Sequence, residues 1–101
     1  MWIFIFFDLP TESKADKKEY LQFRKKILQI GFNMFQFSIY WKQLGSLEST
    51  VRDIKRVKRI LPSKGKIGIL RLTDVQCEKM LIYHEKKEVK VAKTTCQLEF
   101  F

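Results

Sequence analysis

One carboxylate stands where it could take part in chemistry. Residues 2–7 are all apolar, and this run ends at Asp8, which Leu9 and Pro10 follow. An apolar run without Gly or Pro predicts a central strand that is covered on both faces. Polar groups that follow strand ends often line sites in open sheets, but Asp before Leu-Pro is also a common turn sequence. Asp8 is therefore either a turn residue or a functional carboxylate.

A single carboxylate is a poor site for a hard dication. Such an ion usually takes one or two carboxylates together with phosphate and water oxygens. In a symmetric dimer, however, a residue near the two-fold axis is doubled, so two copies of Asp8 could share one Mg²⁺ or Mn²⁺ ion and present it to a phosphodiester. Asp8 is thus the candidate metal ligand and catalytic residue, and this interpretation depends on the geometry of a dimer.

Positive charge is the strongest signal in the composition. The 101 residues include 20 Lys and Arg against 11 Asp and Glu, which gives a formal net charge of +9. A field of this sign favours polyanions, either nucleic acid or an anionic membrane surface. The cations are either solvated surface charges or phosphate contacts. The candidate nucleic-acid-binding residues are Lys14, Lys17, Lys18, Arg52, Lys55, Arg56 and Arg59.

The sequence gives little support for a catalytic triad, a cysteine metal site or an N-terminal targeting signal. His84 has no partner set for a Ser or Cys triad, and Cys77 and Cys96 lack metal-ligand spacing, which favours two small buried hydrophobic residues. The apolar start of the chain has no basic residue before it, and it falls far short of the roughly 20 apolar residues that span a bilayer. We therefore expect a cytoplasmic protein. Because neither predicted basic helix has an exposed Trp or Phe face, we also expect no role at a membrane surface.

The spacing of apolar residues predicts the elements that position these groups. One helix follows Pro10, with Thr11 or Ser13 as its N-cap and Gly31 as its stop. A second begins at Ser46 and ends at Pro62, and four of its cations share one face. The segments between and after the helices predict a kinked hairpin over 32–42, a turn over 63–66, strands over 67–73, 80–84 and 96–101, a short turn over 74–79, and a flexible or extended linker over 85–93.

This order of elements is β-α-β-β-α-β with a further strand, which is typical of the ferredoxin-like α+β fold. We expect a ferredoxin-like domain over residues 1–84, followed by a linker and C-terminal strand over residues 85–101. The extra strand has no obvious place in a four-stranded sheet. We therefore expect it to pair with the sheet edge of a partner protomer, by strand exchange in a homodimer.

Three segments together resemble a known family. They are IFIFFDLPT, GFNMFQFSIYWK and IKRVKRILPSKGKIGILRLTD, within residues 1–84. In these segments the chain is similar to the small CRISPR-associated proteins that partner the integrase in spacer acquisition, especially the type II versions. The resemblance implies a ferredoxin-like homodimer in which Asp8 is the metal ligand and proposed nuclease residue. It also implies that four residues lie near the dimer axis and the metal site: Phe7, Gln36, Ser38 and Tyr40.

The resemblance implies two functions for the chain. In the first, a basic homodimer bridges two integrase dimers and binds the backbone of duplex DNA without reading bases. In the second, a Mg²⁺- or Mn²⁺-dependent endonuclease cuts RNA or double-stranded DNA at a paired Asp8 site. Met34 stands where many relatives have Arg, and lysines replace arginines early in the first helix. Because Lys lacks the bidentate fork of Arg, we favour the binding role.

A third possibility rests on the fold alone, because some ferredoxin-like sheets bind single-stranded RNA through exposed aromatic residues. That class carries aromatic residues in a Gly-containing motif on a central strand, and the segment KGKIGILRL lacks them. We therefore set this possibility below the other two.

Overall fold

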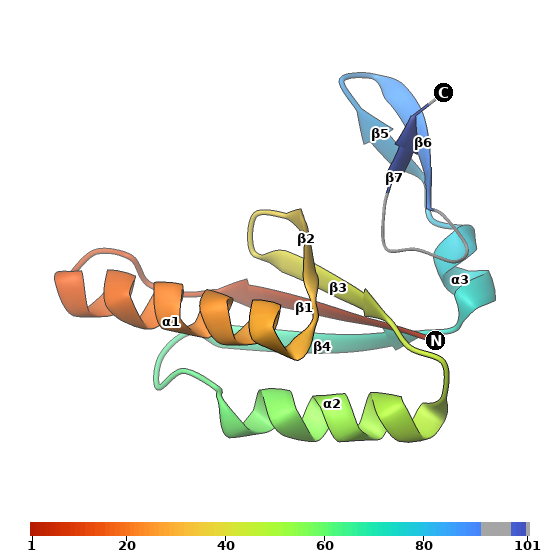
Figure 1. Cartoon of the computed structure of the whole chain (residues 1–101). Helices are drawn as coiled ribbons and strands as arrows, with labels where there is room; N and C mark the ends of the chain where they lie inside the picture. The colour runs from red at the N-terminus through yellow and green to blue at the C-terminus, as the bar shows by residue number, and fades with distance from the viewer. Residues whose placement is uncertain (92–97, 101) are drawn as a thin grey trace.

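The computed structural model describes residues 1–91 and 98–100, which form a four-stranded sheet, two long helices and a smaller C-terminal sheet (Figure 1). The order of elements through β4 confirms the expected ferredoxin-like α+β arrangement. The elements are β1 (Trp2–Asp8), α1 (Lys14–Ile30), β2 (Asn33–Gln36), β3 (Ile39–Gln43), α2 (Leu47–Arg59), β4 (Lys66–Leu72), α3 (Asp74–Glu78), β5 (Ile82–His84), β6 (Lys87–Val91) and β7 (Leu98–Phe100).

β1 lies inside the main sheet, as its apolar sequence predicts. The strand order is β2-β3-β1-β4, and all three pairings are antiparallel. Ile3, Ile5 and Phe7 pack in the core under α1 and α2, which cover one face of the sheet (Figure 1). Trp2 and Phe4 pack on the opposite face, because successive strand residues point to opposite sides. The packing on that second face does not extend to the end of β1, because Phe6 is 47% exposed.

Both long helices have the caps that their sequences predict. Ser13 rather than Thr11 is the N-cap of α1, where its hydroxyl accepts from the backbone N–H of Asp16 in a capping box. Gly31 ends α1 with a φ of 109°, a left-handed conformation that favours glycine. Ser46 caps α2 with a hydroxyl that accepts from the backbone N–H of Ser49. No helix within residues 1–91 and 98–100 is both long and apolar enough to cross a membrane.

A buried ion pair joins the helices to the sheet. The Nζ of Lys42 on β3 lies 2.6 Å from Oδ2 of Asp53 on α2, and the carboxylate is fully buried. The same Nζ donates to the backbone carbonyl of Ile30 at 2.8 Å. One ammonium therefore connects β3, α2 and the end of α1. Nothing in the sequence pattern predicted this contact, because it joins residues on three separate elements.

The C-terminal region differs from the sequence prediction in two places. Residues 74–78 form a short helix where we expected a turn, because Thr73 and Gln76 form a capping box. The linker expected over 85–93 is wrong for residues 87–91, which form β6 and pair with β5 in a hairpin. Val89 of β6 is buried in the core of the second sheet face, and this packing explains the order of a highly charged segment.

The predicted tail strand is present in part. Residues 98–100 form β7, and they pair with β6 of the same chain. Cys77 is buried as expected, whereas Cys96 lies outside the described residues. Strand exchange between protomers concerns a second chain, so it stays a prediction.

Candidate nucleic-acid interface and metal site

Asp8 lies at the end of β1, on the sheet face that α1 and α2 leave open. Phe7, its neighbour, packs under the helices, so the side chain of Asp8 falls on the opposite side together with Phe6. The carboxylate is exposed. Asp8 also occupies a ladder position opposite Lys66, the first residue of β4. Asp8 is therefore the last residue of a paired strand, and its carboxylate lies at the solvent-exposed end of the sheet.

A cavity of about 520 Å³ opens beside Asp8. Three elements meet there, namely the ends of β1 and β4 and the loop between β2 and β3. The lining combines apolar side chains with one carboxylate and one ammonium, and it consists of Phe6, Phe7, Asp8, Phe37, Ser38, Ile39, Lys66, Ile67 and Gly68. An aromatic wall beside charged groups is the composition that suits a nucleotide or the same surface of a second protein copy.

The four residues that the resemblance places near the site occupy different surroundings. Ser38 lines the cavity, and its carbonyl accepts from the N–H of Phe7 at 3.0 Å. Gln36 is exposed beyond the irregularity that bends β2, as the kinked hairpin predicts. Tyr40 is buried under the helices, where its ring stacks on Phe7 with centroids 5.7 Å apart. The structure therefore brings Ser38 to Asp8 and places Tyr40 in the core.

The Tyr40 hydroxyl has its own partner. Arg24 of α1 donates from Nε to this hydroxyl at 2.8 Å. The contact ties the middle of α1 to β3 through a partly buried hydrogen bond. Tyr40 thus supports the strand that carries the Ser38 loop rather than reaching the cavity itself.

The donor set of one chain does not fit a divalent cation. Among the described residues there is no group of three or more His, Cys, Asp or Glu side chains that could hold a metal ion. Among the described residues that line its cavity, Asp8 is the single carboxylate, and Lys66 holds the ladder position opposite it. A hard cation needs more oxygen ligands than this. Any metal at Asp8 therefore depends on ligands from outside the chain.

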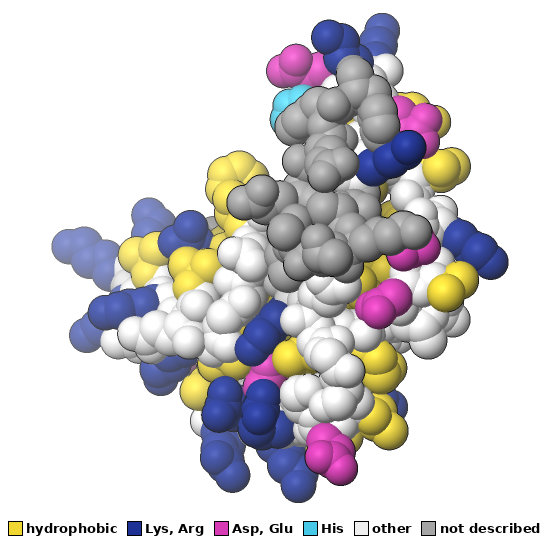
Figure 2. Space-filling model, turned by 45° about the vertical axis from the view of Figure 1, so that its right-hand side comes forward, with side chains coloured by type: hydrophobic (Ala, Val, Ile, Leu, Met, Phe, Trp, Pro, Cys, Tyr) yellow, Lys and Arg dark blue, Asp and Glu magenta, His cyan; other side chains and the backbone are white. Residues whose placement is uncertain are grey.

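The predicted cations cover the outer faces of both helices. Figure 2 shows Lys and Arg side chains gathered over α1, on the left, and over α2, at the bottom. The N-terminal half of α1 presents a shallow hollow in which Leu21 is surrounded by lysines. We define the α1 lysine cluster as Lys14, Lys17 and Lys18, and the α2 basic stripe as Arg52, Lys55, Arg56 and Arg59. All seven residues are exposed.

The α2 basic stripe is not uniform. Arg52 and Arg56 lie 3.6 and 3.5 Å from the buried Oδ1 of Asp53, which has no hydrogen-bond partner of its own. Within the described part of the chain, Lys55 and Arg59 have no such carboxylate neighbour. Arg52 and Arg56 therefore share one buried carboxylate with Lys42, whereas Lys55 and Arg59 lie away from it.

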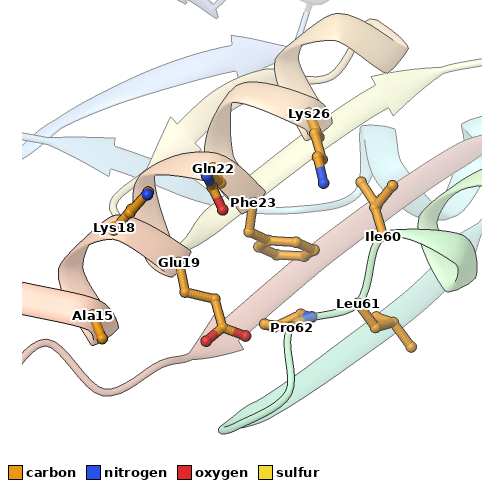
Figure 3. Close-up of a pocket in the computed structure, with 9 residues that line it drawn as sticks. All are labelled: Ala15, Lys18, Glu19, Gln22, Phe23, Lys26, Ile60, Leu61 and Pro62. Atoms are coloured by element: carbon orange, nitrogen blue, oxygen red, sulfur yellow. The ribbon is translucent and has the colours of Figure 1, made fainter.

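Sequence reasoning missed a second groove, between α1 and the segment that follows α2. Figure 3 shows Lys18, Gln22 and Lys26 along α1 above Ile60, Leu61 and Pro62. Glu19 points from α1 toward this segment, and its carboxylate accepts from the backbone N–H and the hydroxyl of Ser63, the latter at 2.9 Å. The spacing of Lys18, Gln22 and Lys26 in the sequence shows that they share one face of α1. It does not show the groove, because the other wall is the segment that follows α2.

Comparison with known proteins identifies the relatives of this chain. The family model described as "CRISPR associated protein Cas2" matches residues 1–80. A "CRISPR-associated endoribonuclease Cas2" from Flavobacterium psychrophilum is 46% identical over 101 residues, which is 100% of this chain and 88% of the relative. Proteins of the same name from Parvibaculum lavamentivorans and Streptococcus mutans are 35% and 34% identical, over 100% and 99% of this chain and 100% and 92% of the relatives.

Proposed function

Because the chain belongs to the Cas2 family of CRISPR-associated proteins, we propose that it is a subunit of a spacer-acquisition complex. In this proposal a homodimer bridges two integrase dimers and binds the backbone of duplex DNA in the cytoplasm. The observation that carries the proposal is the basic cover of both helices, where every predicted cation is exposed. Phosphate contacts from Lys and Arg supply affinity and orientation without base readout. The partner integrase then supplies the chemistry.

Two features support the homodimer. The open face of the sheet carries Phe6, Phe37 and Leu70, which are 47%, 85% and 47% exposed. Exposed aromatic and aliphatic side chains beside a polar rim suit a second copy of the chain. In addition, β4 is an edge strand of the main sheet, with one side open for a further strand. The C-terminal strand of a partner protomer would satisfy the backbone groups along that edge.

The second candidate function is phosphodiester hydrolysis, with RNA or double-stranded DNA as substrate. It is favoured by the names of the relatives, which are called endoribonucleases, and by the exposed carboxylate of Asp8 beside a cavity. A shared Mg²⁺ or Mn²⁺ ion would polarise the phosphate. The donor set of one chain does not fit that ion, so this function requires two Asp8 side chains across the dimer axis. We rank it second for this reason.

A charge-reversal experiment tests the binding proposal. We expect the double substitution Lys17→Glu/Lys18→Glu to weaken binding to all duplex sequences alike. The slope of log affinity against log salt should flatten by about one unit for each phosphate that the protein no longer neutralises. The matched control is Lys86→Glu/Lys87→Glu, which makes the same change of charge on the β5–β6 hairpin. If the two variants lose the same affinity, the loss follows from the change in net charge alone. That result would contradict the proposal that duplex DNA binds at α1.

The substitution Asp8→Asn separates the two functions. It removes the charge but keeps the size of the side chain. Under the scaffolding proposal, integration by the complex reconstituted with its integrase persists in this variant. Under the nuclease proposal, Mn²⁺-dependent cleavage by the purified protein disappears. Loss of integration with intact dimerisation and intact duplex binding would contradict the scaffolding proposal and favour an essential metal site.

A further inference from the structure

The groove between α1 and the segment after α2 has a polar ridge on one side and an apolar wall on the other. We call it the α1–α2 groove. Its volume is about 420 Å³, and it is lined by Ala15, Lys18, Glu19, Gln22, Phe23, Lys26, Ile60, Leu61 and Pro62. The surface proposed for the homodimer and the cavity beside Asp8 lie on the sheet face that the two helices leave open (Figure 1). Neither of them therefore occupies this groove.

Residues 60–62 form the apolar wall, and the fold holds this wall beside α1. Ile60 is the C-cap of α2 and packs partly against the main core. Ser63, directly after the wall, donates from its hydroxyl to the Glu19 carboxylate at 2.9 Å. Figure 3 shows the side chains of Ile60 and Lys26 pointing toward each other across the groove. An apolar side chain of a ligand can therefore pack on the wall while a cation stays within reach of the same ligand.

The polar ridge consists of Lys18, Gln22 and Lys26, which are four residues apart along α1 and are exposed. Within the described residues, none of the three makes an ion pair or a side-chain hydrogen bond. Glu19 is the one carboxylate among the described residues that line the groove, and it is engaged with Ser63. The ridge thus offers two ammoniums and one amide to a ligand, and the lining has a net positive charge.

These features suit an acidic polypeptide segment better than a nucleic-acid duplex. A duplex carries its phosphates on a convex surface, so it would leave the apolar wall of a groove this small uncovered. Lys18 and Lys26 lie about 12 Å apart along the helix axis. In an extended chain, side chains four residues apart point to the same side at about 13 Å, and the residue midway between them also faces that side. Two carboxylates that flank an apolar residue in this way are complementary to the two lysines and the wall.

We propose that the α1–α2 groove binds an extended acidic segment of a partner protein. Two carboxylates of the segment pair with the lysines of the groove, and an apolar side chain packs on residues 60–62. Main-chain groups of the segment bond to the Gln22 amide, which can both donate and accept. The inference goes beyond the proposed DNA-binding function and does not depend on it. Because Lys18 also belongs to the α1 lysine cluster, a bound segment would remove one cation from the surface proposed for DNA.

The test uses the full chain and the synthetic peptide Gly-Glu-Ser-Leu-Ser-Glu-Gly with blocked termini, in about 0.15 M salt so that distant exposed charges are screened. We expect the amide resonances of Gln22 and Leu61 to shift on titration. Lys26→Gln should weaken binding about threefold, as loss of one exposed ion pair predicts. Lys25→Gln changes the neighbouring lysine, which lines the hollow around Leu21 instead, and should leave the affinity unchanged. The same loss in both variants, or no shift at the groove, would overturn the inference.

A second peptide and a duplex separate the possible ligands. Replacing the peptide's Leu by Ser keeps its charge and should weaken binding about threefold or more, because the apolar wall is then unused. Equal affinity for the two peptides would contradict the inference, since charge alone would explain the binding. Duplex affinity is measured on the same proteins. If Lys26→Gln weakens duplex binding and leaves peptide binding unchanged, the groove is part of the DNA surface and the inference is wrong. If the wild type fails to bind duplex while the peptide results hold, the proposed DNA-binding function is wrong and the groove assignment stands.

Discussion

Replacing Asp53 by Asn should strongly destabilise the protein. The substitution keeps the shape of the side chain but removes the negative charge that faces Lys42 at 2.6 Å. The carboxylate is fully buried, and the side chain of Lys42 is only 19% exposed. The ammonium then keeps the Ile30 carbonyl as its acceptor, at 2.8 Å, but has no counterion. An uncompensated buried charge is the expected cause of instability.

The magnitude follows from the burial of the pair. Breaking a buried ion pair costs about 3–5 kcal/mol, and we expect about 3 kcal/mol because Lys42 retains some contact with water. For a domain of this size, that reduction in the free energy of unfolding lowers Tm by about 12–24 °C. Arg52 and Arg56, at 3.6 and 3.5 Å from Asp53, are also deprived of a neighbouring charge, but they are exposed and contribute little.

Thermal and urea unfolding of the variant measure this destabilisation. Protein concentration must be equal in all samples, because dimer formation would make Tm depend on concentration. Glu12→Gln makes the same change of charge at an exposed residue and serves as the control. The double variant Lys42→Met/Asp53→Leu should recover most of the stability, since well-packed apolar side chains often replace a buried pair without penalty. A Tm for Asp53→Asn equal to that of the control would refute the reasoning.

Three further predictions concern the tail, a turn and the α2 basic stripe. Deletion of residues 95–101 should convert the dimer to monomer or aggregate in light scattering, and an unchanged dimer would contradict strand exchange. Gly65→Ala should cost about 2 kcal/mol or more in urea unfolding, because φ is positive and the added Cβ would meet the backbone of Asp8. Gly45→Ala, where a Cβ meets nothing within 4 Å, should cost far less. Arg59→Glu should weaken duplex binding more than Arg52→Glu, since Asp53 already offsets the charge of Arg52; equal effects in a filter-binding assay would contradict this.

Local patterns predicted most of the ferredoxin-like core. The apolar run of β1, the serine caps of both helices and the stop at Gly31 each have a cause within a few residues, so the sequence displays them directly. β6 was missed because only Val89 and Val91 alternate within a charged segment. Val89 becomes ordered by packing with Trp2, Trp41 and Cys77, which lie outside its own hairpin. That cause is tertiary and leaves no local pattern.

The candidate site likewise contains some features that the sequence predicts and others that depend on tertiary structure. Asp8 and the basic residues were predictable, because a carboxylate at a strand end and a periodic row of cations are visible in the sequence. The place of Lys66 was not, because it depends on the register between β1 and β4. The approach of Arg52 and Arg56 to Asp53 was also invisible, since nothing in the helical pattern shows that this aspartate is buried.

The charges around Asp8 bear on how two copies would meet. If the homodimer forms through the open sheet face, it covers Phe6 and Phe37 and brings the two Asp8 side chains close together. Two carboxylates alone would repel each other, and a bridging cation would then be needed to hold the copies in contact. With Lys66 opposite each Asp8, the four charges sum to zero. Pairing of the copies is then compatible with a metal-free site, and the exposed apolar surface can supply the association energy.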